Sequence, residues 1–147
     1  MLNEIIGGIQ IADKVESWQD AIELAASPLL QKGMIKEDYI DAMITNINKL
    51  GPYVIIAPHV AIPHARPEDG VNKLAMSLLK LNQPIAFSEE ERHQASLIFI
   101  LAATDNQTHL KALSQLSTML SEEENIDTLI NGKTIEDLQI LIDKYSE

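Results

Sequence analysis

Apolar side chains follow two kinds of pattern along the chain. Several segments carry them at helical spacing, typical of a helix with one face on a core, and others form short apolar runs typical of strands. Ser17 and Thr134 are each followed three residues later by an aspartate, as at helix starts. The pattern predicts helices over 18–30, 36–50, 108–120, 123–130 and from Thr134 to about 142, and strands over 9–15, 54–64, 74–81 and 96–103.

The breaks between these elements predict the fold class. Asn82-Gln83-Pro84 should end the strand over 74–81, and the polar run 88–94 should form a surface loop that exposes His93. The run 96–103 is apolar at both odd and even positions, as in a strand that is covered on both faces of the sheet. Strands alternate with helical pairs, so we expect one α/β domain over 1–147, a mixed sheet of about four to five strands with helices on both faces.

Composition narrows the class of protein. The 147 residues are enough for one domain with a full core, and 46% apolar residues is too high for a disordered chain. No apolar run approaches the ~20 residues that cross a bilayer, and the N-terminus lacks the basic start of a secretory signal, so we expect a cytoplasmic protein. The absence of cysteine excludes disulfides, thiolate metal sites and cysteine nucleophiles.

The chain is strongly acidic, with a formal net charge of −11. Nucleic-acid binding needs clustered lysine and arginine, so no nucleic-acid partner is expected. Negative charge favours association with a basic protein surface, although it also serves simply to keep a protein soluble.

The stretch 54–69 holds the most distinctive chemistry. Its prolines cannot sit inside a fully paired central strand, so this strand should be at an edge, bulged, or ending near the histidines. His59 and His64 each follow a proline, and Arg66 lies two residues after His64. A rigid strand end that presents an imidazole beside an arginine is suited to chemistry on an anion.

Another histidine, His109, follows the apolar run 96–103. If that strand neighbours 54–64, His64 and His109 emerge at the same end of the sheet, where ligand sites of open α/β sheets lie. His59 and His64 are five residues apart, and along a regular strand they point to opposite faces. His64 is therefore the better candidate, and His59 is expected to support or border the site.

Most familiar site types lack a motif here. The chain has no Gly-x-Ser-x-Gly elbow, no Walker A loop and no Gly-x-Gly-x-x-Gly fingerprint, so no nucleotide or other cofactor is expected. Zinc on His59, His64 and His109 stays open as an alternative, but these residues lack tight ligand spacing and we expect no metal.

Imidazole itself is a good nucleophile toward phosphorus. Phosphoryl transfer needs positioning and neutralisation of charge on the phosphoryl oxygens. His109 as an N–H donor, Arg66, and the start of the helix predicted at Thr108 with its first amides are the candidates to supply this.

Two segments carry a family resemblance. The segments 57–68, with Ile-Pro-His-Ala at its centre, and 101–110, ending in His-Leu, resemble the two histidine regions of the IIA components (EIIA) of the bacterial sugar phosphotransferase system, fructose–mannitol type. The resemblance runs from about residue 5 to 142. It implies that His64 accepts a phosphoryl group from HPr and passes it to the cysteine of an EIIB partner, upstream of a membrane EIIC. It also implies that His109 steadies the phosphoryl group, and it leaves a homodimer open.

Within the family, the Ala-Arg-Pro-Glu after His64 is most similar to the ascorbate-type subgroup, with the galactitol type next. Mannitol-type members carry an arginine upstream of the active histidine, near the positions of Asn48 and Lys49 here. That difference weakens a mannitol assignment and favours Arg66 as the local cation. The alternatives are a regulatory EIIA-like protein, as nitrogen-related IIA proteins are, or an EIIA for galactitol or another sugar or polyol.

Overall fold

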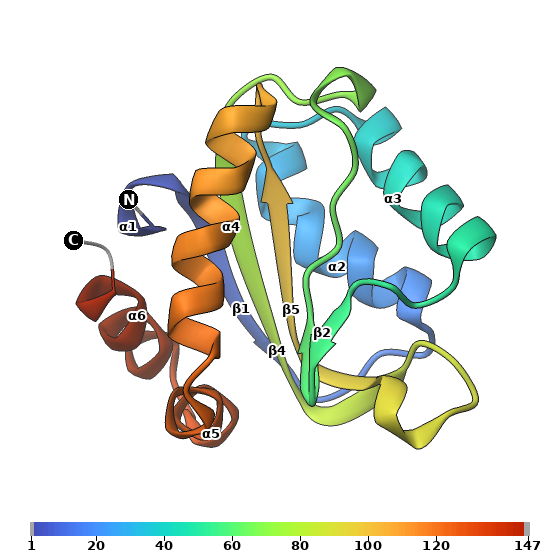
Figure 1. Ribbon diagram of the computed structural model, residues 1–147. Coiled ribbons are helices and arrows are strands. Elements are labelled where there is room, and N and C mark those ends of the chain that lie inside the picture. The colour runs from blue at the N-terminus through green and yellow to red at the C-terminus, as the bar shows by residue number, and fades with distance from the viewer. Residues whose placement is uncertain (1, 146–147) are drawn as a thin grey trace.

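A computed structural model describes residues 2–145 and shows a mixed, five-stranded open sheet (Figure 1). The outer strand β1 runs parallel to β4, β4 antiparallel to β5, β5 parallel to β3, and β3 antiparallel to the other outer strand, β2. The predicted α/β fold with a mixed sheet is confirmed. In sheet order the strands are β1 Ile6–Ala12, β4 Ala75–Ala86, β5 Gln94–Ala102, β3 His59–Ala61 and β2 Ile55–Ala57.

Helices cover both faces of the sheet, as the sequence predicts (Figure 1). One buried cluster joins the sheet to α2 and α3, and a second joins the opposite face to the short α1 and to α4, α5 and α6. Residues of β5 alternate between the two clusters, so this strand is covered on both faces. The helices are α1 Leu2–Ile5, α2 Trp18–Gln31, α3 Glu37–Leu50, α4 Asn106–Leu120, α5 Glu123–Asn131 and α6 Ile135–Lys144. No helix within the described residues is both long and apolar enough to span a bilayer.

Capping side chains set the starts of three helices. Ser17 Oγ accepts a hydrogen bond from the Asp20 amide at 3.1 Å, and Thr134 forms a capping box with Asp137. α4 begins at Asn106, earlier than predicted, because Asp105 is its cap. The four-residue α1 and two short 3₁₀ helices, Pro67–Asp69 and Glu91–His93, carry too little periodicity to be predicted.

The first strand was predicted three residues too late, at 9–15 instead of Ile6–Ala12. Gly7 and Gly8 look unlike strand residues, yet here they let α2 approach β1 closely. A Cβ atom on Gly8 would lie 2.5 Å from Pro28 Cβ, and one on Gly7 would lie 2.5 Å from a methyl carbon of Leu29. The glycines therefore mark a close helix–strand contact instead of a loop.

We expect Gly8→Ala to lower the free energy of unfolding by about 1–3 kcal/mol, because the added methyl group overpacks against the Pro28 ring. Urea denaturation followed by circular dichroism measures this directly. An unchanged midpoint would contradict the close contact between α2 and β1.

The predicted strand 54–64 is in fact two short strands, β2 and β3, joined at Pro58 as an antiparallel hairpin. The expectation of one continuous strand over 54–64 was wrong. β2 lies at the edge of the sheet and Ile56 is 46% exposed, so the edge position that the prolines allow is correct. Pro84 does not end β4 either. The strand continues to Ala86, because its pairing with β5 is interrupted between Lys80 and Ile85, which leaves room for a proline.

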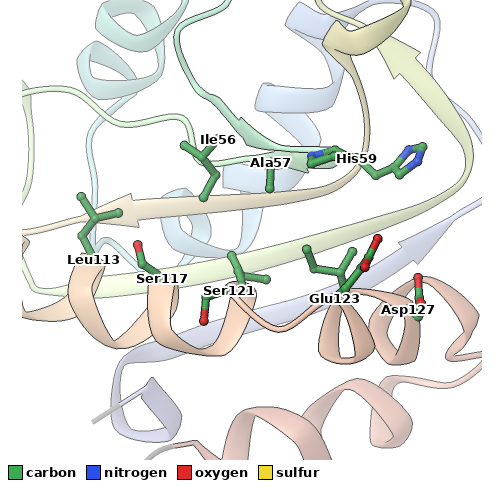
Figure 2. A pocket seen from close by; sticks show the side chains of 11 residues that line it. Ile56, Ala57, His59, Leu113, Ser117, Ser121, Glu123 and Asp127 are labelled. Carbon is green, nitrogen blue, oxygen red and sulfur yellow. The ribbon is translucent and has the colours of Figure 1, made fainter.

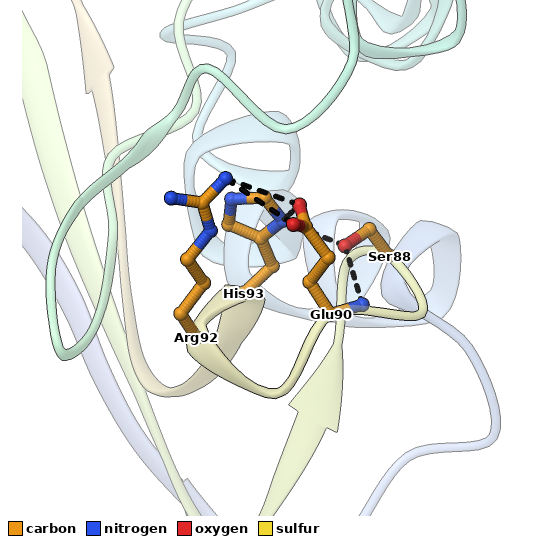
Figure 3. Close-up of polar contacts among 4 residues, drawn as sticks. All are labelled: Ser88, Glu90, Arg92 and His93. Atoms are coloured by element: carbon orange, nitrogen blue, oxygen red, sulfur yellow. Dashed lines mark hydrogen bonds and ion pairs between the residues drawn. The ribbon is translucent and has the colours of Figure 1, made fainter.

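His93 does not project into solvent as predicted; its side chain is only 18% exposed (Figure 3). The 3₁₀ turn folds the loop back, so that His93 Nδ1 lies 2.6 Å from Ser88 Oγ and 3.2 Å from Glu90 Oε2. Both groups meet the same ring nitrogen, whereas a hydrolytic triad needs the hydroxyl and the carboxylate on opposite nitrogens. These contacts hold the loop together and do not activate Ser88.

Candidate active site

A hollow of about 260 Å³ lies where β3 and β5 end. Pockets for drug-sized molecules are typically larger, at about 300–1,000 Å³, so this hollow suits a small group. Its lining residues come from α3, from the segment between α3 and β2, from the segment after β3 and from the start of α4. Its lining residues are Asn46, Tyr53, His64, Ala65, Arg66, Pro67, Asn106 and His109.

His64 is held in one tautomer by the backbone. Its Nδ1 lies 2.8 Å from the carbonyl oxygen of Ile62. A carbonyl can only accept a hydrogen bond, so Nδ1 carries the proton and donates it. The other ring nitrogen, Nε2, therefore holds the lone pair and is the nucleophilic atom.

His109 lies beside His64 in the hollow. The two ring centroids are 5.0 Å apart, with the ring planes inclined by 49°. Burial lowers the pKa of His109, and the neighbouring His64 lowers it further. His109 is thus neutral near pH 7, and its imidazole can donate one N–H to a bound group.

The sheet brings these histidines together. β3 and β5 are parallel neighbours, with Val60 opposite Leu97 and Ala61 opposite Ile98, so both chains leave the sheet at the same end. The segment after β3 then carries His64, and α4 starts with His109 in its first turn. The sequence predicts this meeting, and the structure shows it.

Tyr39 of α3 is a site-supporting residue that the sequence does not reveal. Its buried hydroxyl accepts a hydrogen bond from the Ala65 amide at 3.0 Å and donates one to the Leu101 carbonyl at 2.6 Å. Burial raises its pKa to about 12, which keeps the hydroxyl protonated. One side chain therefore ties the segment after His64 to the end of β5, which leads to His109.

We expect Tyr39→Phe to lower the free energy of unfolding by about 1–3 kcal/mol, because it leaves the Ala65 amide and the Leu101 carbonyl without their partner. Urea denaturation measures the loss. Tyr145→Phe is the matched control. The Tyr145 hydroxyl donates to Glu122 in an exposed contact and accepts from Asn125 Nδ2, which keeps two other acceptors, so its loss should cost less. Equal losses for the two variants would contradict a special role for Tyr39.

Two further residues line the hollow without having been predicted. The ring of Tyr53 meets His64 edge-on, at a centroid distance of 6.2 Å. Burial raises the pKa of Tyr53, while a hydrogen bond with Asn46 acts in the opposite direction. Asn48 and Lys49, which lie near the arginine position of mannitol-type members, are both exposed and do not line the hollow. Asn46, two residues before Asn48, does line it.

Arg66 lies at the hollow, as predicted. Its backbone N–H donates to Asp69 Oδ2 at 2.9 Å, which fixes the start of the 3₁₀ turn Pro67–Asp69. No ion pair within the described part of the chain involves its exposed guanidinium. This cation is free to meet an anion.

Thr108 and the first amides of α4 are placed differently from the expectation. Asp105 accepts hydrogen bonds from the Thr108 amide and hydroxyl, each at 2.7 Å, and from the Gln107 amide. The Thr108 amide is the main reason why the pKa of Asp105 is lowered. The cap thus occupies donors that were expected to bind phosphate, and Thr108 orients the helix start. Asn106 lines the hollow in its place.

His59 does not join this hollow. It sits at the opposite end of β3, is exposed, and lines a separate groove. Across residues 2–145, no group of three or more histidine, aspartate or glutamate side chains is placed to hold a metal ion. The zinc alternative, which needs His59 beside His64 and His109, therefore finds no support.

The family model described as "Phosphoenolpyruvate-dependent sugar phosphotransferase system, EIIA 2" matches residues 6–145. This chain belongs to that family. EIIA proteins are phosphotransferases of the sugar phosphotransferase system, which accept a phosphoryl group from HPr and pass it to EIIB. The resemblance seen in the sequence is confirmed.

Three relatives show how this EIIA chain compares with known proteins. The ascorbate-specific EIIA component of Escherichia coli (strain K12) is 31% identical over 92% of this chain and 89% of that protein. The solution structure of the E. coli mannitol-specific cryptic phosphotransferase enzyme IIA CmtB is 36% identical, covers 97% of this chain and 93% of that one, and has a TM-score of 0.83. The E. coli complex of enzyme IIAMtl and phosphorylated enzyme IIBMtl is 25% identical, covers 92% and 94% of the two chains, and has a TM-score of 0.80.

Proposed function

We propose that Nε2 of His64 accepts the phosphoryl group from phospho-HPr and donates it to a cognate EIIB, in the uptake of L-ascorbate through a membrane EIIC. The observation that carries this assignment is the hydrogen bond from His64 Nδ1 to the Ile62 carbonyl. It leaves Nε2 unprotonated without any general base.

In the transfer, the Nε2 lone pair attacks phosphorus in line with the bond to HPr. That bond breaks, its electron pair stays on HPr, and a P–N bond forms on His64. The proton stays on Nδ1, which keeps donating its hydrogen bond to the Ile62 carbonyl, so the phosphorylated ring keeps its orientation. The N–H of His109 and the guanidinium of Arg66 stabilise charge on the phosphoryl oxygens.

The small hollow fits a carrier that handles only the phosphoryl group. Both partners must approach the same His64, so the surface around it should bind two proteins in turn. Leu110, beside His109 in the sequence, is 65% exposed, and Tyr53 is also exposed. Tyrosine is a typical anchor of protein interfaces, and Leu110 adds exposed apolar surface beside it.

The substrate assignment is supported by the 31% identity to the ascorbate-specific component over most of both chains. Mannitol is the second candidate, since CmtB is 36% identical. The test is transfer from the phosphorylated chain to purified ascorbate-type and mannitol-type EIIB proteins. We expect faster transfer to the ascorbate type. Faster transfer to the mannitol type would favour the second candidate, and transfer to neither would favour a regulatory role.

A further inference from the structure

A second and larger hollow, of about 720 Å³, lies away from His64 (Figure 2). It is a groove between the β2–β3 hairpin on one side and the second half of α4 with the start of α5 on the other. None of its lining residues lines the hollow of His64. The proposed phosphoryl transfer does not use it.

The groove has an apolar centre and a polar rim. Ile56, Leu113 and Ile126 bring apolar side chains to it from three different elements. Its serines and carboxylates, such as Ser117 and Glu123, are all exposed. Pockets for small molecules place a few polar groups inside to orient the ligand, whereas protein interfaces combine an apolar centre with a wet polar rim. This groove has the second arrangement.

The rim carries unpaired negative charge. Glu123 and Asp127 are four residues apart on α5, so both carboxylates lie on the same face of that helix, toward the groove (Figure 2). Among the described residues, neither forms an ion pair with a lysine or arginine. A ligand that places cations over these two carboxylates would therefore complement the rim.

The hairpin wall of the groove is an open sheet edge. β2 is the outermost strand, and its Ile56 is 46% exposed. Natural proteins usually protect such edges with charge or cover. His59, at the tip of this wall, has φ of 71°, the one positive φ of a non-glycine residue among those described. A positive φ is uncommon for non-glycine residues, histidine adopts it more readily than most, and such conformations cluster at binding and active sites.

We propose that this groove binds a short segment of a partner protein that has apolar side chains along one side and lysine or arginine residues flanking them. The apolar side chains fill the centre beside Ile56 and Leu113, and the cations meet Glu123 and Asp127. A second copy of this chain fits poorly, because both copies carry a net charge of −11. The groove is a docking surface distinct from the phosphoryl site.

The test uses the full chain, labelled with ¹⁵N, and an acetylated and amidated peptide of leucine and lysine at helical spacing as the probe. We expect saturable chemical-shift changes centred on β2, β3, the second half of α4 and the start of α5. Glu123→Gln with Asp127→Asn should weaken the peptide about threefold to tenfold, as for two exposed ion pairs. Glu23→Gln with Asp41→Asn is the matched control, since both are exposed on the helices of the opposite face, and it should leave the affinity unchanged.

Ile56→Asp separates groove binding from general attraction to an acidic surface. The proposal predicts weaker binding, because the substitution removes an apolar wall, whereas attraction to charge alone predicts tighter binding of the lysine peptide. The proposal would be overturned if Ile56→Asp bound the lysine peptide more tightly, or if the control pair weakened binding as much as the groove pair. It would also be overturned by shift changes centred on His64, or by equal binding of a peptide in which glutamate replaces lysine. Phosphorylation of His64 should be unaffected in these variants, so the two proposals fail independently.

Discussion

His64→Ala should accept no phosphoryl group from phospho-HPr, because the substitution removes Nε2, the nitrogen that the hydrogen bond to the Ile62 carbonyl leaves unprotonated in the hollow. In the proposed transfer the neighbouring His109, with its ring centroid 5.0 Å from that of His64, donates an N–H to the phosphoryl group, and we expect it not to replace His64 as the acceptor. Intact-mass spectrometry at neutral pH, after incubation with phosphoenolpyruvate, enzyme I and HPr, measures the yield. Wild type should gain one phosphoryl group and the variant none.

His59→Asn is the matched control for that experiment. It removes an imidazole from the same stretch of chain but from a different hollow, and asparagine tolerates the positive φ at this position. This variant should gain one phosphoryl group as wild type does. A wild-type yield from His64→Ala would show that another residue is the acceptor.

The second large effect is expected at His109. His109→Ala should slow phosphoryl transfer by about 10²–10³-fold, the usual cost of removing one hydrogen-bond donor that stabilises transition-state charge. Burial and the neighbouring His64 both lower the pKa of His109, so near pH 7 it acts as a neutral donor and does not depend on protonation. Rapid-quench measurement of transfer from phospho-HPr gives the rate.

Lys111→Ala on the same helix controls for a general loss of positive charge near the site. Lys111 is exposed and does not line the hollow, so its substitution should change the transfer rate far less. If His109→Ala transfers at the wild-type rate, or if Lys111→Ala is equally slow, His109 does not stabilise the phosphoryl group.

The parts of the fold that could be predicted are those with a local cause. Helical spacing and the caps at Ser17 and Thr134 place α2 and α6 almost to the residue. The error in the first strand arose where a tertiary contact decided the outcome. Gly7 and Gly8 lie in a strand that pairs with β4, and α2 packs so closely on them that a Cβ atom has no room.

The residues of the candidate site also fall into those that could be predicted from the sequence and those that could not. His64 and His109 could be found because each follows an apolar strand, and parallel strands bring their ends together. Tyr39 could not, because its hydrogen bond to Leu101 spans 62 positions of the chain and its own surroundings read as an ordinary helix face. Nor does the pattern show that Asp105 takes the helix amides that a phosphoryl group would otherwise use.

The position of the phosphoryl group on the ring tests the central claim most directly. ¹⁵N and ³¹P NMR of the phosphorylated chain, with ¹⁵N in the histidine rings, identifies the bonded nitrogen. The account predicts phosphorus on Nε2 of His64, with the Nδ1 proton still donated to the carbonyl of Ile62. Phosphorus on Nδ1 of His64, or on any other histidine, would contradict it.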